Sequence, residues 1–335
     1  VFVDGSFFLR ELFKTRGLLQ YRQRRSVPFS GQRTYMSIIT PPSAPQMVFA
    51  YDGEFVKDHG FKSVKELLRH HKRGVYTSAR TYEKHSLLFY DKQIARLCNV
   101  PQIVEKNASD LDFKLVKDFV TPSVSAALDT FWNKNKSRAN EGQVTMLMIP
   151  SEGGKLLDKY SMYVVVTPLT QHLGDTMKVE VRKFVRDNPE IKHLSWASTR
   201  TKLEKAKAPD ANEVIMVDDT GAIAEGLSSN FYTVEGGKVI TAPDNKVLAG
   251  TMRGLILEVC ESLGVPVELR LPTIDTLDTW EGAFLSSTSR LLLPINRVHV
   301  IAENKVKDIP TSAVATSVLA ELQNVLRKHA TKILN

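Results

Sequence analysis

The apolar runs of this chain are all short, and this limits its fold more than any other feature. The longest candidates, such as Tyr163–Val166 with its neighbours and Leu291–Leu293, have the length of core strands. None approaches the ~20 residues that a membrane-spanning helix needs, so a protein built on such helices is excluded. At about 150 residues per domain, the 335 residues favour two globular domains.

Strand and helix patterns are mixed in both halves of the chain. Strand patterns occur at 47–51, 74–82, 146–149, 162–167, 213–217, 231–234 and 238–241, and helix patterns at 64–71, 91–97, 252–263 and 312–333. This mixture predicts an α+β fold. The predicted domain map has a basic extension (1–45), a smaller domain (46–167), a linker (168–177) and a larger domain (178–335).

The first 45 residues carry most of the net positive charge of the chain. They hold seven basic residues against two acidic ones, so they contribute +5 to the net charge of +8. An Arg- and Ser-rich, acid-poor segment is typical of an organelle transit peptide. The alternative is an ordinary extension that packs on the body through Phe7, Phe8 and Leu12. The predicted location is therefore the cytoplasm, or a mitochondrion or plastid if the arm is a transit segment. No nucleic-acid-binding signature accompanies the charge.

Cys98 and Cys260 are the two cysteines. Without a CxxC pattern or a Cys/His cluster, no metal site is expected. The pair is interpreted as two buried thiols, with one long-range disulfide as the alternative.

Four segments in the second half carry the chemistry. They are Ile191-Lys192-His193-Leu194, Ala224–Phe231 (AEGLSSNF), Leu248–Arg253 (LAGTMR) and Phe284–Arg290 (FLSSTSR). In this order and spacing they resemble the fold type IV pyridoxal-phosphate enzymes, which include branched-chain and D-amino-acid aminotransferases and aminodeoxychorismate lyases. Upstream, 73–82 and 86–99 resemble the strand and helix of the family's smaller domain. The resemblance covers roughly 47–305 and implies a two-domain fold with the cofactor at the domain interface.

The resemblance implies that pyridoxal 5'-phosphate is the cofactor and gives two residues its central chemistry. Lys192 matches the lysine that forms the Schiff base. Lysine suits this role because a desolvated lysine amine loses its proton readily. Glu225, 33 residues later, matches the acid that faces the pyridine nitrogen. A carboxylate there keeps the ring protonated and able to accept electrons.

The same resemblance implies a cup for the cofactor phosphate. Gly250 and Thr251 precede a predicted helix, whose N-terminus offers N–H groups to an anion. The other implied cofactor contacts are Arg96, Leu248, Met252, Ser287 and Thr288, with Arg96 suited to grip an oxyanion through its fork of N–H groups. Many family members carry Thr where this chain has Met252, so one hydroxyl donor is missing.

The substrate side is predicted on the strand at 74–82. Strand alternation puts Tyr76, Ser78 and Arg80 on one face, where Arg80 is expected to bind a substrate carboxylate or to form an ion pair inside the sheet. Branched-chain enzymes carry Tyr five residues after the lysine, whereas this chain has Ala197 there and Trp196 beside it. That departure and the Thr77-Ser78-Ala79-Arg80 run look more like the lyase branch.

The resemblance implies an aminotransferase activity, which moves an amino group between an amino acid and a 2-oxo acid. It also implies a homodimer. The alternatives are a pyridoxal-phosphate lyase of the aminodeoxychorismate type and a non-catalytic descendant of the fold. Small-molecule substrates are expected, without nucleic acid or membrane partners. The amino donor and its stereochemistry are not fixed by these residues.

Overall fold

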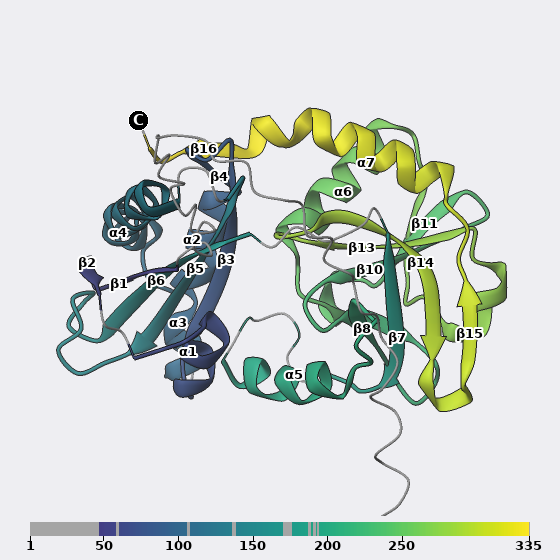
Figure 1. The fold of residues 1–335 in the computed structure, drawn as a ribbon, viewed down its shortest axis with the longest axis horizontal. Coiled ribbons are helices and arrows are strands. Elements are labelled where there is room, and N and C mark those ends of the chain that lie inside the picture. The colour runs from purple at the N-terminus through teal and green to yellow at the C-terminus, as the bar shows by residue number, and fades with distance from the viewer. Residues whose placement is uncertain are drawn as a thin grey trace, which may run out of the picture. The chain divides into compact units, whose positions relative to one another are not determined.

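The structure is a computed structural model that describes residues 47–57, 60–105, 108–135, 139–169, 176–186, 189, 192 and 194–334. The extension predicted at 1–45 lies outside the described residues, as do His193 and residues 170–175 of the predicted linker. The described residues form two β-sheets and the helices that cover them (Figure 1). This α+β architecture agrees with the fold class predicted from the sequence.

The first sheet has seven strands among the described residues, in the order β16-β4-β3-β5-β6-β1-β2. Their bounds are β1 Val48–Tyr51, β2 Glu54–Val56, β3 Val75–Tyr82, β4 Ser86–Leu88, β5 Gly142–Pro150, β6 Tyr160–Pro168 and β16 Ala330–Lys332. All the neighbouring strands pair antiparallel. The predicted strands at 47–51, 74–82, 146–149 and 162–167 all fall in this sheet.

The second sheet has nine described strands, in the order β12-β11-β10-β13-β14-β7-β8-β9, with β15 paired to β14. Their bounds are β7 Met177–Lys183, β8 Glu213–Val217, β9 Ile223–Gly226, β10 Asn230–Glu235, β11 Lys238–Thr241, β12 Val267–Leu269, β13 Gly282–Ser287, β14 Leu291–Val300 and β15 Lys305–Asp308. Asn230 pairs with Glu225 on one side and with Ser286 on the other. Two of the sequence segments singled out above are therefore brought together by strand register.

The described helices are α1 Val64–His70, α2 Tyr90–Cys98, α3 Val100–Val104, α4 Phe113–Asn135, α5 Leu194–Ala206, α6 Thr251–Ser262 and α7 Ala313–Val325. The predictions at 64–71, 91–97 and 252–263 are confirmed within a residue or two. Three of the described helices, α3, α4 and α5, were not predicted. The proline Pro122 lies inside α4, while α5 buries only Leu194, Trp196 and Ala197 and has no long apolar stripe.

The predicted helix at 312–333 is wrong in its last third. The helix α7 ends at Val325, a 3₁₀ turn follows at Leu326–His329, and β16 then pairs with β4 in the first sheet. Long-range pairing with Ser86–Leu88 overrides the local helical pattern. The last described strand, β16, therefore joins the sheet that β1 to β6 form (Figure 1).

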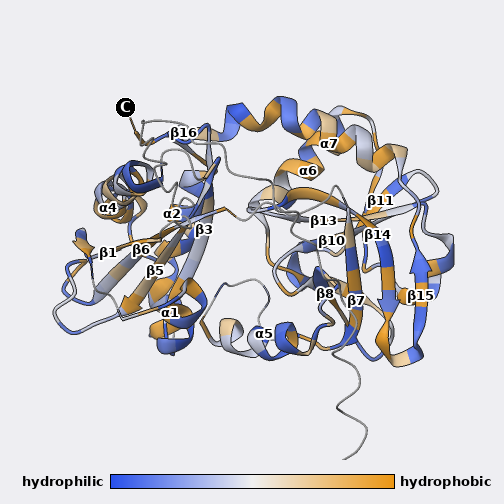
Figure 2. Ribbon diagram, in the orientation of Figure 1, coloured by the Kyte–Doolittle hydropathy of each residue, from blue (hydrophilic) through white to orange (hydrophobic). Residues whose placement is uncertain are grey.

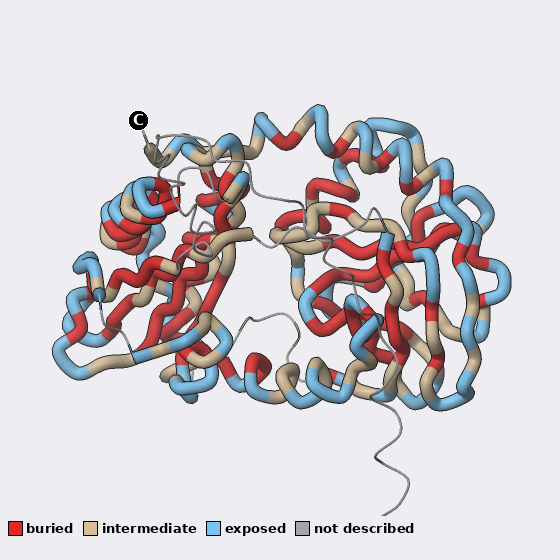
Figure 3. Tube along the Cα trace, viewed as in Figure 1, coloured by how far each residue is buried: buried red, intermediate tan, exposed pale blue. Residues whose placement is uncertain are grey.

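Alternation along β3 decides what each face of the first sheet does. Val75 and Ala79 are buried in a cluster with residues of α2 and α4, such as Ile94 and Val120. Tyr76 and Ser78 alternate with these residues and point to the opposite face, where Tyr76 packs with residues of α1 and α5. Figure 3 shows the inner strands of both sheets largely in red, the colour of buried residues.

The second sheet is buried on both faces. One face packs against α6 and α7, and it includes the stacked rings of Tyr232 and Phe284, whose centroids are 4.5 Å apart. The helix α7 has both hydrophobic and hydrophilic residues along its length (Figure 2), and Val318 and Leu322 lie in this core. Phe231 and Leu285 belong to the core on the other face. This packing fixes the strand ends that carry the site.

Cys98 and Cys260 are buried and free, so the disulfide alternative is wrong. Of the helices in the described ranges, none combines the length and the apolar character needed to cross a bilayer. In the same ranges, no group of three or more His, Cys, Asp or Glu residues is arranged to hold a metal ion.

Candidate active site

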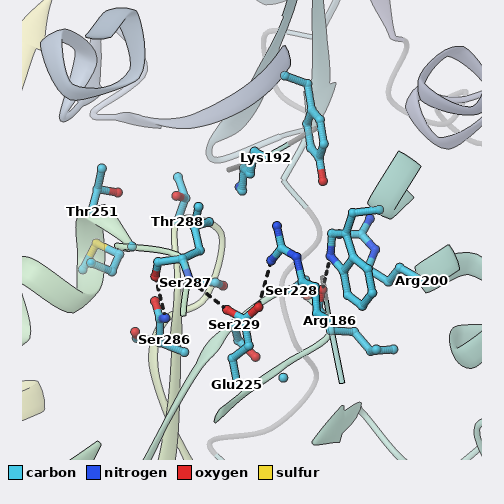
Figure 4. A pocket seen from close by; sticks show the side chains of 18 of the residues that line it. Arg186, Lys192, Arg200, Glu225, Ser228, Ser229, Thr251, Ser286, Ser287 and Thr288 are labelled. Atoms are coloured by element: carbon cyan, nitrogen blue, oxygen red, sulfur yellow. Dashed lines mark hydrogen bonds and ion pairs between the residues drawn. The ribbon is translucent and has the colours of Figure 1, made fainter. Parts of the chain in front are cut away.

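A pocket lined by residues of both sheets contains every residue predicted to contact the cofactor. These are Arg96, Lys192, Glu225, Leu248, Gly250, Thr251, Met252, Ser287 and Thr288. Tyr76 from β3 lines the same pocket. Figure 4 shows Lys192 above Glu225 and Arg186, with Thr251 and Thr288 to one side. The structure thus brings together residues that are up to 212 positions apart in the sequence, Tyr76 and Thr288.

Lys192 lies just before α5 and is held by its main chain. Its carbonyl oxygen accepts a hydrogen bond from the Tyr76 amide at 3.2 Å, and its Nζ lies 5.6 Å from the centre of the Tyr76 ring. Burial, reinforced by the positive charges of Arg96, Arg200 and Arg186, lowers the pKa of the Lys192 amine to about 7. An amine with this pKa is largely neutral near physiological pH, which nucleophilic and base chemistry require.

Glu225 is buried at the base of the pocket and is already bonded. Its Oε1 accepts a hydrogen bond from Arg186 Nη1 at 2.8 Å, and its Oε2 accepts one from the Leu248 amide at 3.2 Å. Burial raises the pKa of Glu225, while Arg186 and the Leu248 amide oppose that shift. The guanidinium of Arg186 also lies 4.9 Å from the centre of the Trp196 ring. The carboxylate is therefore fixed beneath Lys192.

One end of the pocket is suited to an anion. The helix α6 begins there at Thr251, and its N-cap residue Gly250 supplies no side-chain cap to the first-turn N–H groups. Within the described part of the chain, the buried Thr251 Oγ1 has no hydrogen-bond partner. Arg96 reaches the same loop and donates to the Ala249 carbonyl. A phosphate group would satisfy these donors.

Asn230 holds the loop before α6 in place. Its Nδ2 donates to the Leu248 carbonyl at 2.9 Å. A Cβ atom at Gly250 would lie 2.1 Å from Asn230 Oδ1, so only glycine fits at that position. Met252 is buried in the core between α6 and the sheet and also lines the pocket.

A second cavity adjoins this pocket and is called here the front chamber. The two share Tyr76, Lys192, Arg200, Ser228, Ser287 and Thr288, and the front chamber adds Lys62, Lys65, Ser78, Gln143, Thr145, Glu204, Arg290 and others. Ser78 Oγ lies 3.3 Å from Thr145 Oγ1 on the neighbouring strand. The wall that β3 and β5 contribute at this level is polar.

Of the three residues predicted on the substrate side, the structure places two at the cavities and one away from them. Tyr76 lines both cavities and Ser78 lines the front chamber. Arg80 is not among the lining residues of either, and its Nη1 donates to the Ser289 carbonyl at 3.0 Å. Burial lowers the pKa of Arg80 and the charge of Glu141 opposes that effect. The arginine thus contacts the Ser287–Ser289 turn.

The sequence reasoning missed Arg186, Trp196 and Arg200, which all line the pocket. Trp196 and Arg200 are four residues apart on α5, so they share a helix face, and Trp196 Nε1 donates to the Leu227 carbonyl at 3.3 Å. Recognising α5 would have revealed this pair. Arg186 had no local signal, because its partner Glu225 is 39 positions away.

The buried polar groups fit pyridoxal 5'-phosphate. An amine of lowered pKa, a fixed carboxylate and an anion end with an unpartnered hydroxyl are the three requirements of that cofactor, and one pocket contains them all.

Comparisons with known sequences give relatives with two kinds of name. The chain is 26% identical over 234 residues to a probable branched-chain-amino-acid aminotransferase of Thermotoga maritima, covering 67% of this chain and 77% of the relative. It is 30% identical over 110 residues to a D-alanine aminotransferase of Bacillus licheniformis, covering 32% and 38%. A putative branched-chain-amino-acid aminotransferase of Methanocaldococcus jannaschii matches over 160 residues, at 24% identity, and the match spans 56% of that relative's length.

Solved structures show the same fold. A branched-chain aminotransferase from Thermoproteus uzoniensis superposes with a TM-score of 0.66 at 17% identity, over 86% of this chain and 99% of the other. The enzyme of that name from Escherichia coli gives 0.65 at 16% identity, over 86% and 99%. These similarities confirm the fold type IV architecture that the resemblance implied.

The family model for class IV amino-transferases matches residues 74–298. The match begins beside β3, ends in β14 and contains Tyr76, Lys192, Glu225 and both phosphate-side loops. Because it covers most of the chain, the protein belongs to the class IV aminotransferase family.

Proposed function

We propose that this protein is a pyridoxal-phosphate-dependent aminotransferase that moves an amino group between an amino acid and a 2-oxo acid. The observation that carries the proposal is the juxtaposition of a buried, weakly basic Lys192 with the fixed carboxylate of Glu225 in one pocket. The relatives' names agree with it. Bound pyridoxal phosphate would supply a carbonyl carbon that links to amines and a ring that withdraws electron density from the substrate Cα.

Each residue then has a defined task. Lys192 would hold the cofactor and would move a proton at the substrate Cα, because with a pKa of about 7 a large share of its amine is neutral near pH 7. Glu225 provides negative charge at the ring nitrogen, and Arg186 keeps that carboxylate in position. The N-terminus of α6, Thr251, Thr288 and Arg96 hold the phosphate.

Leu248, Met252 and Ser287 complete the proposed cofactor contacts, and Tyr76 and Ser78 face the substrate. A role for Arg80 in substrate binding stays a prediction. So do the homodimer, the domain boundaries and the cellular location. Light scattering of the purified protein tests the homodimer.

A half-reaction assay tests the activity. The cofactor-loaded protein is titrated with a panel of L- and D-amino acids while the absorbance of the lysine-linked cofactor and the released 2-oxo acid are measured. One equivalent of 2-oxo acid per site is expected from the preferred donor, and a second 2-oxo acid should restore the original spectrum. Repeated turnover without any amino acceptor would indicate the lyase alternative. An unchanged spectrum with every donor would contradict the proposal.

A further inference from the structure

Arg200 is a charged residue of the pocket whose position neither the sequence reasoning nor the proposed function explains. It lies on α5, eight residues after Lys192, and its side chain is only 16% exposed. It lines both the pocket around Lys192 and the front chamber, so it stands where a substrate would pass from one to the other. Figure 4 shows Arg200 on the side of the pocket away from Thr251.

Among the residues that the structure describes, the contacts of Arg200 leave most of its guanidinium available. Its Nε lies 3.1 Å from Glu204 Oε1, one helical turn further along α5. The other oxygen of Glu204 is taken by Lys65 Nζ from the start of α1. Two cations therefore share one carboxylate, and the cluster keeps a net charge of +1. Glu204 lies on the Nε side of the guanidinium as an ion pair, and the buried Nε makes no hydrogen bond to the described residues. The terminal nitrogens on the other side can therefore donate two parallel hydrogen bonds.

The other arginines near Lys192 are committed elsewhere. Their acceptors are the Glu225 carboxylate for Arg186, the Ala249 carbonyl for Arg96, the Ser289 carbonyl for Arg80 and the Glu213 carboxylate for Arg290. Lys62 lines the front chamber but is exposed. Arg200 is thus a half-buried cation of this wall. Among the described residues, its ion-pair partner is Glu204, and it contacts neither Glu225 nor the loop before α6.

We infer that Arg200 binds the α-carboxylate of the amino acid and 2-oxo acid substrates. The inference rests on the proposed function, because that function supplies substrates with this group. A planar guanidinium matches a carboxylate bidentately, and the partly dry site strengthens the pair. Binding there places the substrate's Cα between the α5 wall and Lys192, while its side chain extends into the front chamber.

Paired substrates test this role. The assay compares an amino acid with the primary amine of the same side chain that lacks the carboxylate, for wild-type protein and for Arg200→Gln, Arg200→Lys and Arg297→Gln. Arg297 is a matched control, since it is an exposed arginine paired with Asp308 at 2.7 Å, away from both cavities. A charge-assisted hydrogen bond contributes about 1.5–3 kcal/mol, so Arg200→Gln should lower kcat/KM for the amino acid by roughly 10–100-fold.

The expected pattern is specific to the carboxylate. Arg200→Gln should lower kcat/KM for the amine much less than for the amino acid, because the amine feels only the lost charge near Lys192. Arg200→Lys should recover part of the loss, and Arg297→Gln should behave as wild type. An equal loss for amino acid and amine would overturn the inference, because Arg200 would then act through the site's structure or through Lys192. An amino-acid-specific loss in Arg80→Gln, with none in Arg200→Gln, would also overturn it.

Equilibrium binding separates this inference from the proposed function. Calorimetric titration of the cofactor-loaded protein with a 2-oxo acid needs no turnover. If no amino group is transferred by the wild-type protein, the proposed function fails, while a 10–100-fold weaker Kd in Arg200→Gln would still support the carboxylate contact. An unchanged Kd in that variant would refute it.

Discussion

The base of the pocket and its open side differ in how completely their polar groups are paired. At the base, Glu225 accepts two hydrogen bonds and Asn230 ties down the loop before α6. On the open side, Ser78 and Thr145 meet at 3.3 Å and Arg200 shares Glu204 with Lys65. A carboxylate and a loop fixed by the protein suit one permanent ligand, and the unpartnered Thr251 hydroxyl beside them is left for its anion end. Donors left available on the open side suit substrates that enter and leave. Lys192 lies at the boundary between the two.

Removing the boundary residue gives the largest expected effect. Lys192→Ala should lower turnover by roughly 10⁴-fold or more, because both the cofactor link and the proton transfer at Cα are lost. The base would be untouched, so the variant should still bind the cofactor phosphate. Steady-state kinetics and a cofactor titration measure the two effects, and residual turnover near the wild-type level would mean that another group moves the proton.

The lowered pKa of Lys192 also predicts a dependence of stability on pH. In the unfolded chain its pKa is near 10.5, and in the folded protein it is about 7. Between these values the unfolded state binds a proton that the folded state does not, so folding stability falls as the pH drops from about 10.5 to 7. Lys192→Met in cofactor-free protein should therefore be more stable than wild type by a few kcal/mol at pH 7.

This advantage should shrink as the pH rises toward 10.5. Chemical unfolding at a series of pH values measures it. A difference between the two proteins that does not vary with pH would show that Lys192 is not desolvated.

At the base, Glu225→Gln should slow the reaction by roughly tenfold or more while the cofactor stays bound. An amide cannot hold the proton of the ring nitrogen by charge, and a charge-assisted hydrogen bond is worth about 1.5–3 kcal/mol. Single-turnover kinetics with the best donor measure the change. Glu180→Gln is the matched control, because Glu180 is a buried carboxylate paired with Arg182 on β7. It should lose stability without losing rate.

The smallest expected change sharpens the assignment of the anion end. Thr251→Val removes a buried hydroxyl that has no partner in the described structure. Cofactor affinity should fall about tenfold, while the cofactor-free protein should become more stable by about 1 kcal/mol. Thr251→Ser keeps the hydroxyl group, so its changes in cofactor affinity and in stability should both be smaller than those of Thr251→Val. Opposite signs in the two measurements are the signature, and a loss in both would indicate a purely structural threonine.

The parts of the site predicted from the sequence are those whose residues recur in local motifs. Lys192, Glu225 and the Gly250-Thr251 loop lie in one pocket, in which the pairing of β9, β10 and β13 brings Glu225, Asn230 and Ser286 together. Arg186 and Arg200 had no such signal. Their roles follow from contacts made in the folded chain, with Glu225 in one case and with the α1–α5 neighbourhood in the other.

The fold shows the same division. The predicted strands all correspond to strands of the two sheets, but β7 and β13 were not predicted. The end of α7 was not predicted either, because β16 forms only by pairing with strand β4, more than 240 residues earlier. The helix α5 was missed because its packing is limited to a few large side chains and its apolar pattern is weak.

The most direct test of the account is to find the residue that carries the cofactor. The protein is loaded with pyridoxal phosphate, reduced with borohydride, digested and mapped by mass spectrometry. The account predicts a phosphopyridoxyl group on the peptide containing Lys192 and its absence from the Lys192→Ala variant. The same group found on another lysine, such as Lys62 or Lys65 of the front chamber, would contradict it.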